Sequence, residues 1–424
     1  MVSDLTSRSV LPLLPVLCGV APNVLLSKSV AAGDLAARIV VAWTYRPTNE
    51  GRVRSFQATA PWAFDTPPLT VGAHSTLRFA GGLLYVVSRA DATVAVIDPD
   101  TWTILRTLSV GSGREPVDIA VITSDLAYVS CLDETHLLRL NLITGQTTAV
   151  VELSIFADAD GVPDLSMMAV HKGRLFVQLR RIDSSTFGFV PPGMLAVVDL
   201  ATEQLIDVDA GASGIQAIEL QGMAAKLEMQ VVESTRRLFV SASGDFFDEG
   251  GIEMIDLDTL ESLGLIVREE DSTTGADLGA FVLVTPNRGY LTFSTDFALS
   301  SHLVEFTVSG GVVPGGEPFQ TVGYFVPVLP LDPQSNTFFF PDGGANQADV
   351  HVLDAASAAH LATVSIGADS FPTDVVVLPP DMTGPLVPVV SSWGVLIMAL
   401  LVMAAGIALL ARGIIGPLTG KTRE

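Results

Sequence analysis

The sequence predicts an all-β fold, a seven-bladed β-propeller closed by a C-terminal strand, followed by one C-terminal transmembrane helix. A strand that ends in an apolar residue and usually Asp recurs seven times, at spacings of 41 to 58 residues. Each copy follows a strand rich in aromatic and β-branched residues. One long, uncharged apolar stretch lies near the C-terminus. A four-stranded blade needs about 40 to 45 residues, so the longer repeats contain loop insertions.

Residues 1–36 are expected to form a leader. Val10–Ala21 is apolar and follows Arg8, and residues 29–32 supply the small side chains that signal peptidase requires. Asp4 and three prolines in or beside the apolar run leave a disordered leader or a wrongly assigned start as alternatives.

Residues 37–380 carry the repeats. The residues at the Asp position are Gln57, Asp98, Asn141, Asp199, Asp256, Thr307 and Asp354. The preceding strands begin at Arg38, Leu84, Ala127, Leu175, Leu238, Gly289 and Thr337. Aromatic and β-branched side chains suit a packed, pleated surface, so these strands are expected to form the core, and Cys131 is expected to be a buried small residue within them.

The ends of the repeat region predict how the ring closes. The first blade begins with its second strand at Arg38, whereas the last glycine loop is followed by a single strand, Asp374–Leu378. We expect this strand to supply the missing inner strand of the first blade, which hides the sheet edges.

Two copies of the repeat resemble a known family. Leu84-Tyr-Val-Val-Ser with Val-Ile-Asp-Pro-Asp-Thr101, and Ala127-Tyr-Val-Ser with Leu-Asn-Leu-Ile-Thr-Gly145, resemble the YVTN-type β-propeller repeat, whose family includes lactonase-like seven-bladed propellers. The resemblance is clear over residues 77–153 and weaker over 37–378. It implies the fold, but not a reaction, because propellers host many functions.

A transmembrane helix is predicted over residues 393–411, after a linker at 381–392. The 19 residues are apolar and span about 28 Å as a helix, close to the thickness of a bilayer core. Trp393 suits the headgroup level, and the basic tail 412–424 predicts a cytoplasmic C-terminus. A buried core helix is the alternative.

The same region resembles bacterial C-terminal sorting signals of the IPTL-CTERM type, which are related to PEP-CTERM signals. The residues that carry the resemblance are Pro388, Ser391, Trp393, Gly394 and Arg412. It implies delivery to the cell envelope or surface, with the propeller on the extracytoplasmic side, and a membrane sorting peptidase as a partner.

The charge balance indicates which partners to exclude. The chain has 46 acidic and 23 basic residues, a net charge of -23, with 49% hydrophobic residues. Nucleic acid is not an expected partner, because phosphate binding requires clustered Lys and Arg.

The loops on one face of the ring are expected to bind a ligand, although a solvated acidic rim is the alternative. The binding-face candidates are Arg89, Asp133, Arg180, Arg181, Asp183, Asp245, Asp296 and Asp342.

One acidic segment suits a metal ion. Asp158, Asp160 and Asp164 surround Gly161, and alternating carboxylates at a glycine turn can bind one hard cation. Calcium is therefore the ion that this segment would suit, with a plain turn as the alternative, and no other cofactor is predicted.

No catalytic motif is visible, since the histidines are scattered and no GxSxG or phosphate-binding glycine loop occurs. The sequence therefore predicts an exported, membrane-anchored binding or interaction module at the bacterial cell envelope. Its ligand would be an envelope protein, a glycan or a small molecule. The alternative is a periplasmic or surface propeller enzyme, lactonase-like or dehydrogenase-like. An Arg or His that converges with two carboxylates at the mouth of the central channel would favour the enzyme.

Overall fold

The structure is a computed structural model of the whole chain. It describes residues 36–186, 188–221, 229–242, 250–271, 277–294, 300–314, 318–321, 328–344 and 347–380. The leader up to residue 35, the linker and sorting motif, the predicted helix 393–411, the basic tail, Asp245 and Asp296 lie outside these ranges. Within them, no helix is long and apolar enough to cross a membrane.

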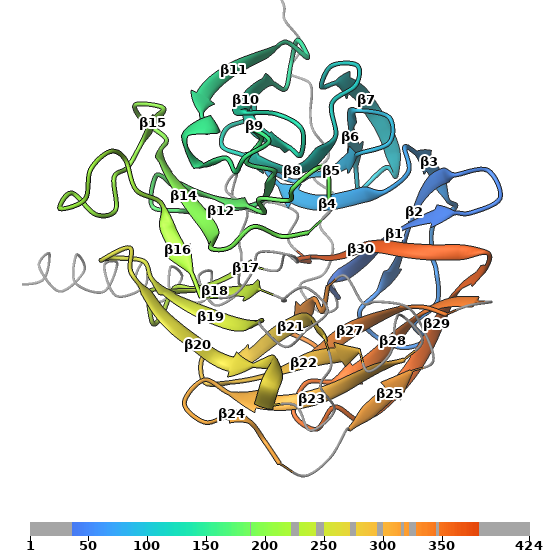
Figure 1. Cartoon of the computed structure of the whole chain (residues 1–424). Helices are drawn as coiled ribbons and strands as arrows, with labels where there is room; N and C mark the ends of the chain where they lie inside the picture. Colours follow the sequence, from blue (N-terminus) through green and yellow to red (C-terminus); the bar gives the residue numbers. More distant parts are fainter. Residues whose placement is uncertain are drawn as a thin grey trace, which may run out of the picture. The chain divides into compact units, whose positions relative to one another are not determined.

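The described residues form seven antiparallel sheets arranged as the blades of a propeller (Figure 1). Blade 1 consists of β30 (Ser370–Leu378), β1 (Arg38–Tyr45), β2 (Glu50–Gln57) and β3 (Leu69–Val71). Blade 2 consists of β4 (Ser75–Ala80), β5 (Leu83–Ser88), β6 (Thr93–Asp98) and β7 (Thr103–Ser109). Blade 3 consists of β8 (Pro116–Val121), β9 (Leu126–Cys131), β10 (His136–Asn141) and β11 (Thr147–Glu152).

Blade 4 consists of β12 (Leu165–His171), β13 (Arg174–Leu179), β14 (Gly193–Asp199) and the short strands β15 (Gln204–Leu205) and β16 (Ile218–Leu220). Blade 5 consists of β17 (Met229–Val232), β18 (Arg237–Ala242), β19 (Gly251–Asp256) and β20 (Ser262–Arg268). Blade 6 consists of β21 (Asp277–Thr285), β22 (Arg288–Ser294), β23 (Ser301–Thr307), β24 (Gly311–Val312) and β25 (Phe319–Thr321). Blade 7 consists of β26 (Leu331–Asp332), β27 (Thr337–Gly343), β28 (Gln347–Asp354) and β29 (His360–Ala368). The 3-10 helices are η1 (Ser154–Phe156) and η2 (Glu269–Asp271).

The predicted closure is confirmed. β30 pairs antiparallel with β1 along its whole length, from Arg38 opposite Leu378 to Tyr45 opposite Ser370. The closing strand starts at Ser370, four residues earlier than predicted. The first and last strands of the ring therefore lie in one blade. The last strand, β30, supplies the inner position of a blade whose other three strands come from the start of the repeat region.

The recurring Asp is a turn signal between the third and fourth strands of a blade. The Asn141 side-chain oxygen accepts hydrogen bonds from the backbone amides of Ile143 and Thr144, at 2.9 and 2.8 Å. Asp98, Asp199, Asp256 and Asp354 accept from the amides two and three residues ahead in the same way. Such side-chain turns replace backbone pairing where the strand ends. Gly145 follows with a φ of 74°, a conformation that glycine adopts without strain.

The core lies between the blades. Seven hydrophobic clusters are found among the described residues, one at each junction between neighbouring blades. The aromatic residues of the second strands are buried as predicted, for example Tyr85, Tyr128 and Phe176. Cys131 is also buried, and burial raises the pKa of its thiol to about 12. Each blade is therefore stabilised by contact with its two neighbours.

Candidate functional site

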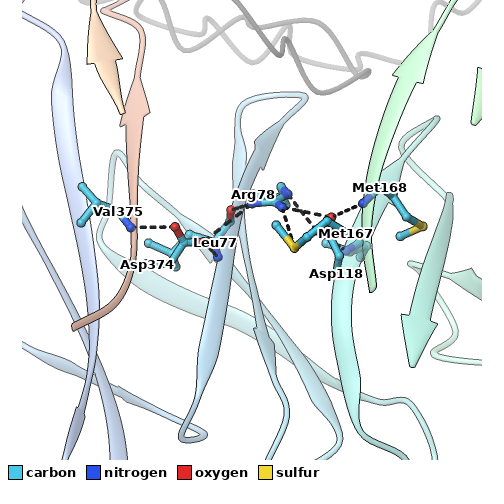
Figure 2. Close-up of polar contacts among 8 residues, drawn as sticks. Leu77, Arg78, Asp118, Met167, Met168, Asp374 and Val375 are labelled. Atoms are coloured by element: carbon cyan, nitrogen blue, oxygen red, sulfur yellow. Dashed lines mark hydrogen bonds and ion pairs between the residues drawn. The ribbon is translucent and has the colours of Figure 1, made fainter. Parts of the chain in front are cut away.

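A network of charged side chains lies on the innermost strands (Figure 2). Arg78 of β4 contacts Asp118 of β8, with Nε 2.8 Å from Oδ1 and Nη2 3.0 Å from Oδ2. Arg78 Nη1 lies 3.7 Å from Oδ2 of Asp374 on β30. Arg78 also approaches the sulfur of Met167 on β12, 3.7 Å away. The network thus joins the inner strands of blades 1 to 4.

Both carboxylates also bind backbone amides, and they do so in the same pattern. Asp118 accepts from Ile119 of its own strand at 2.7 Å and from Met168 of the next blade at 2.8 Å. Asp374 accepts from Val375 at 2.8 Å and from Leu77 of the next blade at 2.7 Å. The inner edge of each sheet has no further strand to pair with, so these carboxylates satisfy amides that would otherwise lack partners.

The buried position changes how these groups titrate. Burial raises the pKa of Asp374 to about 6, and Arg78 opposes the rise. Burial also raises the pKa of Asp118, again against Arg78. One guanidinium cannot neutralise two ionised carboxylates, so the group would carry one excess negative charge, and the charge of Asp118 adds to burial in raising the pKa of Asp374.

Arg78 and its two carboxylates match in composition the cluster that would favour an enzyme, but the geometry differs. Asp118 is fully buried, and both of its oxygens are already bound to amides and to Arg78. A general acid or base must reach the substrate within hydrogen-bonding distance. The arrangement fits a structural connection between blades, and it does not favour the enzyme alternative.

This network was not predicted from the sequence. Its members are far apart in the sequence, and Arg78 lacks a motif. A signal was present in the repeat, however: Pro116-Val117-Asp118 and Pro372-Thr373-Asp374 place the same Pro-x-Asp pattern in two inner strands.

The structure brings three of the predicted binding-face residues together above blades 2 to 4. Arg89 follows β5, Asp133 follows β9 and Arg180 follows β13. Arg89 Nε lies 3.5 Å from Glu115, between β7 and β8. Burial raises the pKa of Asp133, with Glu115 adding to the rise and Arg89 opposing it. Burial lowers the pKa of Arg180 to about 10, Asp164 opposes this, and the positive charge of Arg89 adds to it.

The other candidates of the loop face have separate roles. Arg181 donates to the carbonyl oxygen of Pro192 at 2.9 Å, across the base of the loop 181–192. Asp183 accepts from Ser185 and Thr186 within that loop. Asp342 lies in blade 7, where its carboxylate is 3.6 Å from Nε2 of His351. These residues do not join the group formed by Arg89, Asp133 and Arg180.

The predicted calcium segment connects to the loop 181–192. Asp160 accepts from the amide of Ser184 at 3.0 Å, and Asp164 accepts from the amide of Ile182 at 2.6 Å. Burial raises the pKa of Asp164 to about 6. In the described part of the chain, no group of three or more His, Cys, Asp or Glu side chains has the arrangement of a metal site. Calcium binding stays a prediction, which calcium titration followed by thermal melting tests.

A shallow pocket of about 370 Å³ lies at the opposite end of blade 3. It is lined by Asp125, Leu126, Arg139, Asn141, Gln146 and Thr148. Beside it, Arg139 and the hydroxyl of Tyr128 both bind Glu203 of blade 4, at 3.1 and 2.8 Å. These contacts connect neighbouring blades, so we assign this region to the scaffold.

No family model matches the chain, and no curated protein matches it. Solved structures do resemble it. A protein from Lactobacillus plantarum is 16% identical, with a TM-score of 0.56, over 81% of this chain and 99% of that one. A 6-phosphogluconolactonase candidate from Bacteroides fragilis is 11% identical, with a TM-score of 0.54, over 82% and 100% of the two chains. Hydrazine synthase of Kuenenia stuttgartiensis is 11% identical, with a TM-score of 0.51, over 72% and 89%.

These similarities establish the class of fold and nothing finer. The chain is a seven-bladed β-propeller. At such low identity, the activities of the similar proteins do not transfer to this chain.

Proposed function

We propose that this chain is an exported, membrane-anchored propeller that binds a ligand at the bacterial cell envelope through the loops above blades 2 to 4. The carrying observation is the convergence of Arg89, Asp133 and Arg180 from three different blades on one face of the ring. Loops on a rigid scaffold are common binding sites, because the scaffold fixes the positions of the side chains.

The anchoring part of the proposal rests on the sequence. The apolar stretch 393–411 is long enough to span a bilayer, and the basic residues that follow favour a cytoplasmic C-terminus. The resemblance to sorting signals at Pro388 to Gly394 supports delivery to the envelope. The propeller would then lie outside the cytoplasm.

The ring centre supports a binding module over an enzyme. The carboxylates beside Arg78 are committed to backbone amides. The group formed by Arg89, Asp133 and Arg180 contains both positive and negative side chains, so it offers hydrogen-bond donors and acceptors. Such a set suits recognition of a polar ligand.

Two epitope tags test anchoring and processing together. One tag is inserted after Pro380 and the other follows Glu424, and membranes and soluble fractions of the bacterial host are separated. We expect both tags in the membrane fraction, with the first accessible to external protease and the second protected. Tags in different fractions would demonstrate cleavage of the tail. Both tags in the cytoplasmic fraction would overturn the proposal.

A matched control identifies the segment responsible for anchoring. The variant Ala404→Arg/Ala405→Arg places two charges at the centre of the predicted helix, which is costly in a bilayer core. We expect this variant to leave the membrane fraction. If it remains there to the same extent, the stretch 393–411 does not anchor the chain.

A further inference from the structure

His351 and Asp342 of blade 7 face each other without a hydrogen bond. Nε2 of His351 lies 3.6 Å from Oδ2 of Asp342, which is beyond hydrogen-bonding distance. Nε2 of His351 and Oδ1 of Asp342 are both closed to solvent, and neither has a hydrogen-bond partner. Asp342 is only 8% exposed, so its carboxylate is largely removed from water. A buried carboxylate is costly unless a cation or hydrogen-bond donors offset the loss of water.

Two other histidine–carboxylate pairs within the described ranges have a different geometry. Nε2 of His136 lies 2.7 Å from Glu152, and Nδ1 of His171 lies 2.9 Å from Glu233. Both are ordinary hydrogen-bonding distances, and both carboxylates are more exposed than that of Asp342. Asp342 therefore has the least contact with water and the longest distance to its histidine. An ion pair alone would be expected to close that distance.

The strands of blade 7 hold the two side chains on one side of the sheet. Asp342 lies on β27 and His351 on β28, and Phe340 of β27 is the residue opposite His351. Asp342 is two residues beyond Phe340, so both side chains leave the strand on the same side. Phe319 of β25 in blade 6 packs against this side, with its ring centroid 5.4 Å from that of Phe340 and 5.0 Å from that of His351. The pair therefore lies in the junction between blades 6 and 7, beside an aromatic cover.

A further unpartnered oxygen faces the same junction. Thr321 is two residues beyond Phe319 on β25, so its side chain leaves the strand on the side of Phe319. Its hydroxyl is closed to solvent and has no hydrogen-bond partner. Buried polar atoms without partners are uncommon, so a nitrogen and two oxygens of this kind in one junction indicate a missing partner.

The other nitrogen of His351 contacts a hydroxyl group. Nδ1 lies 3.2 Å from Oγ1 of Thr363 on β29, and Nε2 of His360 lies 3.0 Å from the same oxygen. When Nδ1 of His351 carries the ring hydrogen, it donates to Thr363, and Thr363 donates to His360. Nε2 of His351 then presents its lone pair to Asp342. A histidine that binds a metal ion through one nitrogen usually donates the other N–H to such a partner, which fixes the orientation of the ring.

The distance between the pair suits two ligands of one metal ion. Zinc binds imidazole nitrogen and carboxylate oxygen at about 2.0 to 2.2 Å, so two such atoms at a tetrahedral ion are about 3.4 Å apart. The 3.6 Å between Nε2 of His351 and Oδ2 of Asp342 is close to that value. An imidazole ligand favours zinc and similar ions over calcium and magnesium, which prefer oxygen ligands.

We propose that His351 and Asp342 bind a divalent transition-metal ion of the zinc class in the junction between blades 6 and 7. The pair supplies two ligands, fewer than the three or four of most zinc sites, in agreement with the absence of a three-residue metal group from the described ranges. Water or the hydroxyl of Thr321 takes the other positions, so we expect an exchangeable ion. The site is separate from the loop face above blades 2 to 4 and does not depend on the proposed binding function.

Zinc binding is measured on the full-length chain in detergent by isothermal titration. We expect a saturable site whose affinity falls about tenfold or more in His351→Gln and in Asp342→Asn, because each variant removes one ligand. His136→Gln makes the same change at the exposed pair with Glu152, and its affinity should equal that of the unmodified chain. Calcium should not compete with zinc for the site. Absence of zinc binding, or equal affinity in the two folded ligand variants, would overturn the proposal and leave an ordinary ion pair.

Melting temperatures separate binding from folding. An ion that binds only the folded state stabilises it, so zinc should raise the melting temperature of the unmodified chain and of His136→Gln. The same zinc concentration should have little effect on His351→Gln and Asp342→Asn. If a ligand variant fails to fold, Thr363→Val at an exposed position keeps both ligands and removes the partner of Nδ1. We expect about tenfold weaker zinc binding in this variant, and unchanged affinity would contradict the arrangement proposed for His351.

Discussion

The carboxylate of Asp374 accepts a hydrogen bond from the backbone amide of Leu77 at 2.7 Å, across 297 residues of sequence. Asp374 lies on the closing strand of blade 1, and Leu77 lies on the inner strand of blade 2. The bond therefore connects the strand that closes the ring to the next blade. It is repeated between blades 3 and 4, where Asp118 accepts from Met168 at 2.8 Å.

Arg78 is expected to be the most important single cation for stability. Arg78→Met removes the cation of the 2.8 Å ion pair with Asp118, and Asp118 is fully buried. Loss of one partner of a buried pair should lower the free energy of unfolding by about 3 kcal/mol. Urea unfolding measures the change. The control Arg236→Met, at an exposed pair, should cost at most about 1 kcal/mol, and an equal loss in both variants would contradict the special role of Arg78.

The stability of the ring should depend on pH through Asp374. Its native pKa is raised to about 6 by burial, above its ordinary value of 3.8. Between these values the native state binds more protons than the unfolded state, so the Asp374 contribution to the free energy of unfolding falls as pH rises from about 4 to about 6. Asp374→Asn should remove this dependence. Unfolding curves of both proteins across that window give the difference between their free energies of unfolding. A difference that does not change with pH would show that Asp374 does not titrate there.

The closing strand should control the whole ring. A chain that lacks residues 374–378 loses five of the eight residues of β30 that pair with β1. Since each blade is stabilised by its neighbours, we expect loss of the single cooperative melting transition and cleavage by protease throughout the propeller. If protease removes blade 1 alone and the other blades stay intact, the two ends do not hold the ring together.

The recurring side-chain turn should make a small, measurable contribution to the free energy of unfolding. Asn141→Ala removes the acceptor for the amides of Ile143 and Thr144. Loss of a comparable side-chain cap costs about 1 kcal/mol. Gln146→Ala changes an exposed residue in the same turn and should stay within about 0.5 kcal/mol of the unmodified protein. Thermal melting of the two variants measures the contrast.

The fold was predictable because its signals are local. The period of two in the strands, the Asp or Asn that ends the third strand, and the repeat spacing all act within a few residues. Closure was also predictable, since the first blade lacks a strand at Arg38 and a strand remains near Asp374. The insertion after Asp199 became clear in the structure, where β15 and β16 are two separate pieces of one outer position on β14.

The positions of the candidate residues were predictable in part. Arg89, Asp133 and Arg180 were assigned to one face because loops of the same type share a side of the ring, and in the structure the charge of Arg89 affects the pKa of both Asp133 and Arg180. Arg181, Asp183 and Asp342 were assigned by the same rule but bind within their own blades or loops. Topology determines the face of a loop residue, whereas its side-chain partner depends on the length and shape of each loop.

The chain combines a net charge of -23 with 49% hydrophobic residues, and the sequence and the tertiary structure each determined part of where these residues lie. The sequence by itself determined the number of blades, the buried strands and the order in which the ring closes, because hydrophobic period and turn residues act locally. The tertiary structure decided that two of the acidic residues are buried: Asp118 and Asp374 bind backbone amides of neighbouring blades and share Arg78. Such pairings join residues tens to hundreds of positions apart, and only the closed ring brings them into contact.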